Sequence, residues 1–179
     1  MNATHILILI GTAAFATTCL MVKLLRAFIL HEDELHQTIS DGLTGPYHRV
    51  EDAGFIALGG ALAILGVILA SPISWLCWLV AVGILGAMAS DTYRPFLMRH
   101  FGGTAAKWRE RHLIFAGIAF VGALALEASL AHGWLLWALV AAYPISVGIV
   151  RWIWPKYTAW QEWVAALAIV AFLLAWSIK

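Results

Sequence analysis

The stretch from Ser90 to His112, SDTYRPFLMRHFGGTAAKWRERH, decides the fold because apolar runs long enough to cross a bilayer flank it on both sides. It contains five of the eleven Lys and Arg residues of the chain, together with Asp91 and two histidines. We expect this stretch to be the main loop on one face of a membrane. Asp91 would then end one spanning helix, and His112 would open the next.

The composition indicates a membrane protein. Of the 179 residues, 63% are hydrophobic and 12% are charged, and a typical soluble domain carries about twice that share of charge. A span needs roughly 20 apolar residues, so the chain has room for about six spans and for no separate soluble domain. We therefore expect one integral membrane domain over residues 1–179, with lipids as partners. A net charge of +1 argues against nucleic acid.

Six apolar segments predict an all-α polytopic membrane protein, a bundle of six transmembrane helices. Ser71-Pro72 is the only break between the second and third segments, so these two helices must form an antiparallel hairpin. Small residues recur four apart in them, as at Gly83 and Ala87, and this spacing favours close helix packing. The predicted helices cover about residues 6–30, 53–70, 73–90, 112–130, 134–154 and 158–178.

A short amphipathic segment is predicted between the third and fourth helices. From Pro95 to Lys107, apolar residues such as Phe96 and Phe101 alternate with bases, which suits a segment lying at the membrane interface. Gly102-Gly103 ends the segment. Thr104 then has the side chain of a helix N-cap and can begin the helix that continues into the fourth span.

The distribution of Lys and Arg predicts the orientation. Almost all Lys and Arg residues are expected on one face of the membrane, and the other face carries only Lys179. Such a bias places the face with the basic loops in the cytoplasm. We therefore expect both termini to be periplasmic. Ten of the eleven basic residues fall in the first, third and fifth loops or the adjoining helix ends, namely Lys23, Arg26, Arg49, Arg94, Arg99, Lys107, Arg109, Arg111, Arg151 and Lys156.

Two cysteines and two acids are assigned structural roles. Cys19 and Cys77 lie in apolar runs and form no CxxC pair, which excludes a disulfide framework or a zinc finger. We expect both thiols to be buried as small hydrophobic groups. Glu51 and Asp52 precede the second helix, where negative charge suits the helix dipole.

The candidate ligand-binding residues lie at the predicted cytoplasmic helix ends. Ionisable groups at this depth tend to face the bundle interior and to pair with each other. They either form a network of salt bridges that fixes the helix ends, or line a pocket that binds a metal, a proton or an anionic headgroup. Asp91, His112 and Glu162 are predicted to share one pocket and are the candidate ligands of a divalent metal such as zinc or iron. The complete set is Asp41, His48, Asp91, His112, Arg151 and Glu162.

Glu127 is a further charge near the opposite face. It lies within the fourth predicted helix, a turn and a half before His132. An acid inside a membrane span is a functional-site hypothesis by default. Glu127 is also close enough to the helix end to reach water, so a structural role stays open.

Several short motifs resemble a known family. Ile39-Ser40-Asp41 and Pro46-Tyr47 precede a Gly- and Ala-rich helix, Asp91 closes the next helix, and Trp160-Gln161-Glu162 opens the last. From about Ser40 onward this pattern is similar to the domain-of-unknown-function 998 family of bacterial integral membrane proteins. In that family a Phe-Pro pair precedes the aspartate, whereas Met88-Ala89-Ser90 stands here. The resemblance implies a six-helix bundle in the bacterial inner membrane and no established activity.

Two classes of function are compatible with the sequence. In the first, the cytoplasmic cluster is a working site, either of a metal-assisted hydrolase or for binding a lipid or another amphiphile. In the second, the protein is a non-catalytic accessory subunit that packs against a larger membrane protein complex. The sequence does not decide whether the chain is an enzyme.

Overall fold

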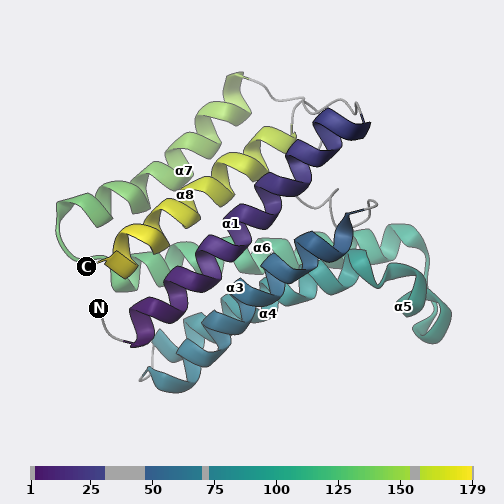
Figure 1. The fold of residues 1–179 in the computed structure, drawn as a ribbon, viewed down its shortest axis with the longest axis horizontal. Helices are drawn as coiled ribbons and strands as arrows, with labels where there is room; N and C mark the ends of the chain where they lie inside the picture. The colour runs from purple at the N-terminus through teal and green to yellow at the C-terminus, as the bar shows by residue number, and fades with distance from the viewer. Residues whose placement is uncertain (1–2, 31–46, 70–72, 154–157, 179) are drawn as a thin grey trace.

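The computed structural model describes residues 3–30, 47–69, 73–153 and 158–178, and in these ranges the regular structure is helical throughout (Figure 1). Six helices are long and apolar enough to cross a membrane, as predicted. A seventh, α5, is short. The helices are α1 (Ala3–Leu30), α3 (His48–Ile68), α4 (Ile73–Thr92), α5 (Arg94–Phe101), α6 (Ala105–Leu130), α7 (Trp134–Ile153) and α8 (Thr158–Ile178).

The starts of two helices lie before the predicted positions. α3 begins at His48, so the acidic pair Glu51 and Asp52 lies inside the helix and is buried. α6 begins at Ala105, as expected if Thr104 is its N-cap, because the Thr104 side chain accepts a hydrogen bond from the Lys107 backbone N–H at 3.3 Å. The extension of α3 brings two acids into the end of the bundle, whereas the ionisable side chains in the extension of α6 are exposed.

Helices that follow one another across the membrane are antiparallel, and contacts between α6 and α8, which are parallel, close the sequence of contacts. α1 lies between α3 and α8, α4 lies between α3 and α6, and α7 packs on α8 (Figure 1). The ring of His5, near the start of α1, contacts the ring of Trp176, near the end of α8, so the two termini lie at one end. We call this the terminal end, and the opposite end, where α5 lies, the α5 end.

Small residues allow the helices to approach closely. A Cβ added at Gly83 of α4 would lie 2.5 Å from the backbone nitrogen of Ala119 in α6. A Cβ at Gly59 of α3 would lie 2.7 Å from Leu85 of α4, which confirms the predicted hairpin. The predicted role of these glycines in packing is therefore confirmed.

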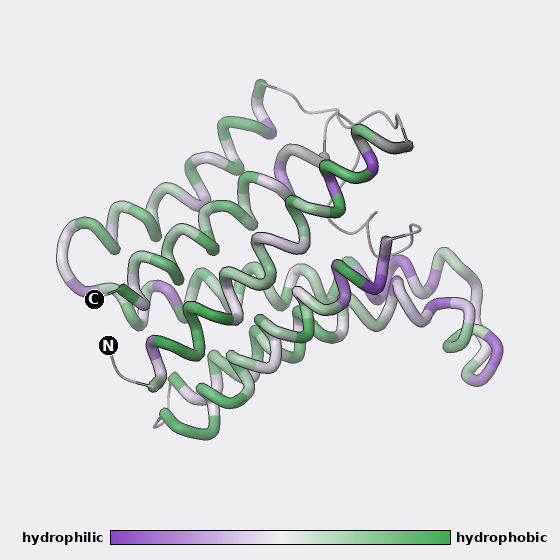
Figure 2. Tube along the Cα trace, viewed as in Figure 1, coloured by the Kyte–Doolittle hydropathy of each residue, from purple (hydrophilic) through white to green (hydrophobic). Residues whose placement is uncertain are grey.

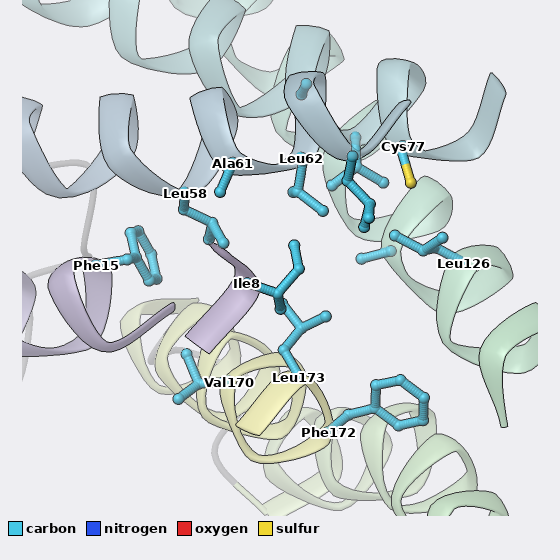
Figure 3. Close-up of a cluster of buried hydrophobic side chains, with 14 of the residues drawn as sticks. Ile8, Phe15, Leu58, Ala61, Leu62, Cys77, Leu126, Val170, Phe172 and Leu173 are labelled. Carbon is cyan, nitrogen blue, oxygen red and sulfur yellow. The ribbon is translucent and has the colours of Figure 1, made fainter. Parts of the chain in front are cut away.

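Apolar side chains fill the interior and also cover the outside. Figure 3 shows Ile8, Leu58 and Leu173 directed into the space between α1, α3 and α8. Figure 2 shows apolar residues along all six long helices, with polar residues concentrated near α5 and the helix ends. The outward-facing Trp134 and Trp152 are 82% and 83% exposed. Since so much apolar surface needs lipid around it, the chain is a multi-pass membrane protein.

α5 is a separate short helix at the end of the bundle. Pro95 lies in its first turn, where proline is tolerated, and Gly102 follows its last residue with a φ of 67°. Phe96 and Phe101 are both exposed. The placement of this helix along the membrane interface stays a prediction.

Candidate binding site inside the bundle

Asp91 and His112 form a buried pair at the α5 end. Because α4 and α6 are antiparallel, the last turn of α4 lies beside the early turns of α6. Asp91 Oδ2 lies 2.9 Å from His112 Nδ1, and Arg94 pairs with Asp91 Oδ1. His112 Nδ1 also lies 3.1 Å from the Ala87 carbonyl oxygen. Both neighbours are acceptors, so we assign the proton to Nδ1, which leaves Nε2 as the nitrogen for another partner.

Glu51 is the centre of a second polar group at this end. Its side chain is only 2% exposed, and the Cys19 thiol of α1 donates a hydrogen bond to it. Arg26 and Glu162 lie close enough to interact with it electrostatically. Polar contacts therefore connect α1, α3 and α8 at the α5 end, as ionisable groups at this depth require.

Asp52, the next residue, connects α3 to α4. Its Oδ1 accepts a hydrogen bond of 2.6 Å from the Thr92 hydroxyl. Thr92 directly follows Asp91, so the end of α4 is held by both α3 and α6. Short polar contacts therefore connect α3, α4 and α6 at the α5 end.

A cavity of about 80 Å³ lies inside the bundle between α1, α3, α4, α6 and α8. Apolar side chains form most of its wall, and three ionisable residues complete it, namely His112, Glu127 and Glu162. His112 and Glu127 are fifteen residues apart on α6, which corresponds to roughly 22 Å along the helix. The cavity therefore has an apolar middle and polar groups toward both ends.

Glu127 defines the end of the cavity that lies toward the chain termini. Its side chain is 1% exposed, and neither carboxylate oxygen has a hydrogen-bond partner among the described residues. Tyr143 of α7 is buried close enough to interact with it electrostatically. The ring of Tyr143 lies 6.4 Å from that of Phe120, which also lines the cavity. This carboxylate is thus surrounded by apolar and aromatic groups.

The predicted cluster is assembled in part. Asp91 contacts His112, and Glu162 shares the cavity wall with His112. His48 is half-buried at the start of α3, and Asp41 lies outside the described residues. Arg151 is exposed at the end of α7, and no ion pair joins it to Asp91 in the described part of the chain.

The metal set Asp91, His112 and Glu162 is not assembled as a metal site. Across the four described ranges, no three His, Cys, Asp or Glu side chains are grouped closely enough to hold a metal ion. The physical reason lies in the contacts of Asp91, whose two oxygens are occupied by Arg94 and His112. The pair that Asp91 forms is therefore an ion-pair network at a helix junction.

The contact between Glu51 and Cys19 is not predicted from the sequence. Glu51 lies in the first turn of α3 and Cys19 is buried, both as expected, but no sequence pattern brings them together. A signal for Glu51 was present, since Phe55, Leu58 and Leu62 follow it at helical spacing on one face. Had the start of α3 been placed at His48, this spacing would have predicted that Glu51 faces the interior.

Comparison of the chain with models of known protein families, with curated proteins and with solved structures gives no match. The resemblance to the domain-of-unknown-function 998 family stays a prediction.

Proposed function

We propose that the protein binds a small amphiphilic molecule within its transmembrane bundle. The observation that carries this proposal is the cavity, whose wall is apolar apart from His112 and Glu162 at one end and Glu127 at the other. Ligand sites in proteins are typically apolar pockets with a few polar groups that fix orientation. A ligand with an apolar body and a polar group matches this distribution, whereas a fully polar solute does not.

The α5 end would supply one polar contact of the ligand. Asp91 fixes the ring of His112 through Nδ1, so Nε2 is the histidine nitrogen that a ligand group can reach. Glu162 provides an acceptor on the same wall. In this proposal His112 and Glu162 face the ligand, and Asp91 orients His112 from behind.

The setting of this site is the bacterial inner membrane, with the α5 end in the cytoplasm and both termini periplasmic. The bias of basic residues toward the loops at the α5 end supports this orientation. A reporter enzyme that is active only in the periplasm, fused to the C-terminus, tests it. An inactive periplasmic reporter together with an active cytoplasmic one would overturn the orientation.

The second candidate function is that of an accessory subunit in a larger membrane complex. One observation favours it, because α7 packs on α8 and buries few residues of its own, with Trp134, Ile145 and Trp152 among the exposed ones. A protein partner on this face would replace lipid. Migration of the purified protein as a single chain, with no co-purifying membrane protein at stoichiometric level, would contradict this alternative.

Photolabelling tests amphiphile binding directly. We would incorporate the purified protein into phosphatidylcholine nanodiscs, add a decanol that carries an aliphatic diazirine, illuminate, and map the labelled residues by mass spectrometry. We expect labelling of cavity-wall residues such as Ala116 and Ile84, in addition to lipid-facing ones.

Matched variants on α8 make the result specific. Ala166→Leu adds bulk to the cavity wall, and Ala171→Leu adds the same bulk on the exposed face of the same helix. Ala166→Leu should remove label from Ala116 and leave label on the exposed Leu167, whereas Ala171→Leu should change neither. Wild-type protein labelled only at exposed residues would refute the proposed function.

A further inference from the structure

We propose that Glu127 is a binding site for an organic ammonium group, so that the amphiphile in the cavity is a cation. This inference rests on the proposed function and specifies the charge of its ligand. It concerns the end of the cavity nearer the chain termini, which has a different environment from the His112 end.

The first observation is a carboxylate that lacks a partner. Glu127 is 1% exposed, lines the cavity, and has no hydrogen-bond donor for either oxygen among the described residues. Charged side chains in membrane helices are costly, so they face the interior and pair with one another. Asp91 pairs in this way with Arg94 and His112. A molecule in the cavity that carries a donor would supply the partner that Glu127 lacks among the described residues.

The second observation is the aromatic surround. Phe120 lies on the same face of α6 as Glu127, two turns earlier, and lines the same cavity. Tyr143 packs close to both, from α7. Aromatic faces attract ammonium groups within about 6 Å of the ring centre, and the attraction is stronger when the groups are removed from water. An organic cation paired with Glu127 would have Tyr143 nearby and Phe120 about 10 Å away along the same face of α6, so its apolar body would lie beside aromatic rings.

An inorganic cation fits this site less well. Ca²⁺ takes six to eight oxygen ligands, and Mg²⁺ requires near-octahedral coordination. The described helices contain no group of three acidic, His or Cys side chains that could hold a metal ion, and the wall near Glu127 is apolar. One carboxylate with apolar walls matches one ammonium group attached to an alkyl or aryl body. The charge pair is neutral as a whole, so it can be buried at lower cost than either ion alone.

The test is a competition in neutral nanodiscs. Diazirine decanol labels the cavity, and unlabelled decylamine, decanol or decanoate is added as competitor, with concentrations expressed per lipid to correct for partitioning. Hydrogen bonds to charged groups contribute about 1.5–3 kcal/mol, so decylamine should displace the label at a concentration at least about tenfold lower than decanol. Decanoate should be the weakest competitor.

Glu127→Gln should abolish the advantage of decylamine while decanol still competes. One control removes a carboxylate outside the cavity and should keep the advantage, namely Glu110→Gln on the exposed part of α6. If Glu127→Gln does not fold, the wild-type order of the three competitors decides the question.

The outcomes separate the two proposals. Equal potency of decylamine and decanol in the wild-type protein would overturn the ammonium site and leave amphiphile binding intact. Loss of the amine advantage in Glu162→Gln, with retention in Glu127→Gln, would also overturn it. Absence of cavity labelling by diazirine decanol would overturn the proposed function itself.

Discussion

Asp91 and Glu127 are both buried acids inside a membrane bundle, 6% and 1% exposed, yet their surroundings differ completely. Asp91 contacts His112 at 2.9 Å and pairs with Arg94 through its other oxygen. Glu127 has no hydrogen-bond partner among the described residues and faces a cavity. Both oxygens of the Asp91 carboxylate are therefore paired at the α5 end, whereas the Glu127 carboxylate at the other end of the cavity has no hydrogen-bond partner among the described residues. The difference indicates that Asp91 connects the helices at the α5 end, and it is the basis of our proposal that Glu127 binds a ligand.

The largest change in the free energy of unfolding should follow from removing Asp91 at the α5 end. Asp91→Ala leaves the buried His112 and the adjacent Arg94 without their shared partner, and breaking a buried pair in this way costs about 3 kcal/mol. We expect the free energy of unfolding, measured by titration with sodium dodecyl sulfate, to fall by that amount.

A control on the same junction shows whether the effect is specific. Glu110→Ala, on an exposed part of α6, should leave the free energy of unfolding nearly unchanged. A loss for Asp91→Ala no larger than that for Glu110→Ala would mean that the α5-end network does not stabilise the fold.

The sequence alone predicts the six membrane spans and one contact of the candidate site. Each span is fixed by the apolar length that lipid requires. The contact between Asp91 and His112 follows from topology, because one residue ends a helix and the other lies near the start of the next, antiparallel helix. Neither inference needs knowledge of which side chains face each other elsewhere.

Other features of the site depend on packing between helices that are distant in sequence. Arg151 has the right depth for the cluster, but α7 packs on α8 and leaves this side chain exposed. The cavity is a property of five helices at once, so no single segment encodes it. Glu51 lies in the first turn of α3 as expected, but its burial was not predicted, because it depends on where α3 begins and helix starts are set by local contacts as well as by hydropathy.

A smaller change in the free energy of unfolding, of opposite sign, is expected when Glu127 is replaced. Glu127→Leu replaces a partnerless carboxyl with an apolar side chain of similar size, and burying an unpaired polar group costs about 1–3 kcal/mol. We expect the ligand-free protein to gain about 1 kcal/mol in free energy of unfolding. Asp91→Leu should show a loss in the same assay. A loss for both variants would mean that Glu127 has a stabilising partner, and the contrast between the two ends would disappear.

The smallest change in the free energy of unfolding is expected at the contact between Cys19 and Glu51. The carboxylate of Glu51 is partly hydrogen-bonded, unlike that of Asp91 or that of Glu127. The Cys19 thiol donates a hydrogen bond to it, yet Glu51 Oε2 has no hydrogen-bond partner among the described residues. A thiol is a weak donor. Cys19→Ala should therefore lower the free energy of unfolding by about 0.5 kcal/mol, at the low end for a hydrogen bond. Cys19→Ser should recover the loss because its hydroxyl is a better donor.

A double-mutant cycle with Glu51→Gln distinguishes the hydrogen bond from simple packing. If Cys19 acts by donating to the carboxylate, the loss in Cys19→Ala should shrink in the Glu51→Gln background, because the charged acceptor is gone. An equal loss in both backgrounds would assign Cys19 to packing alone. Cys19 would then not be a hydrogen-bond donor to Glu51, and the difference in hydrogen bonding between the buried acids at the two ends of the bundle would be smaller.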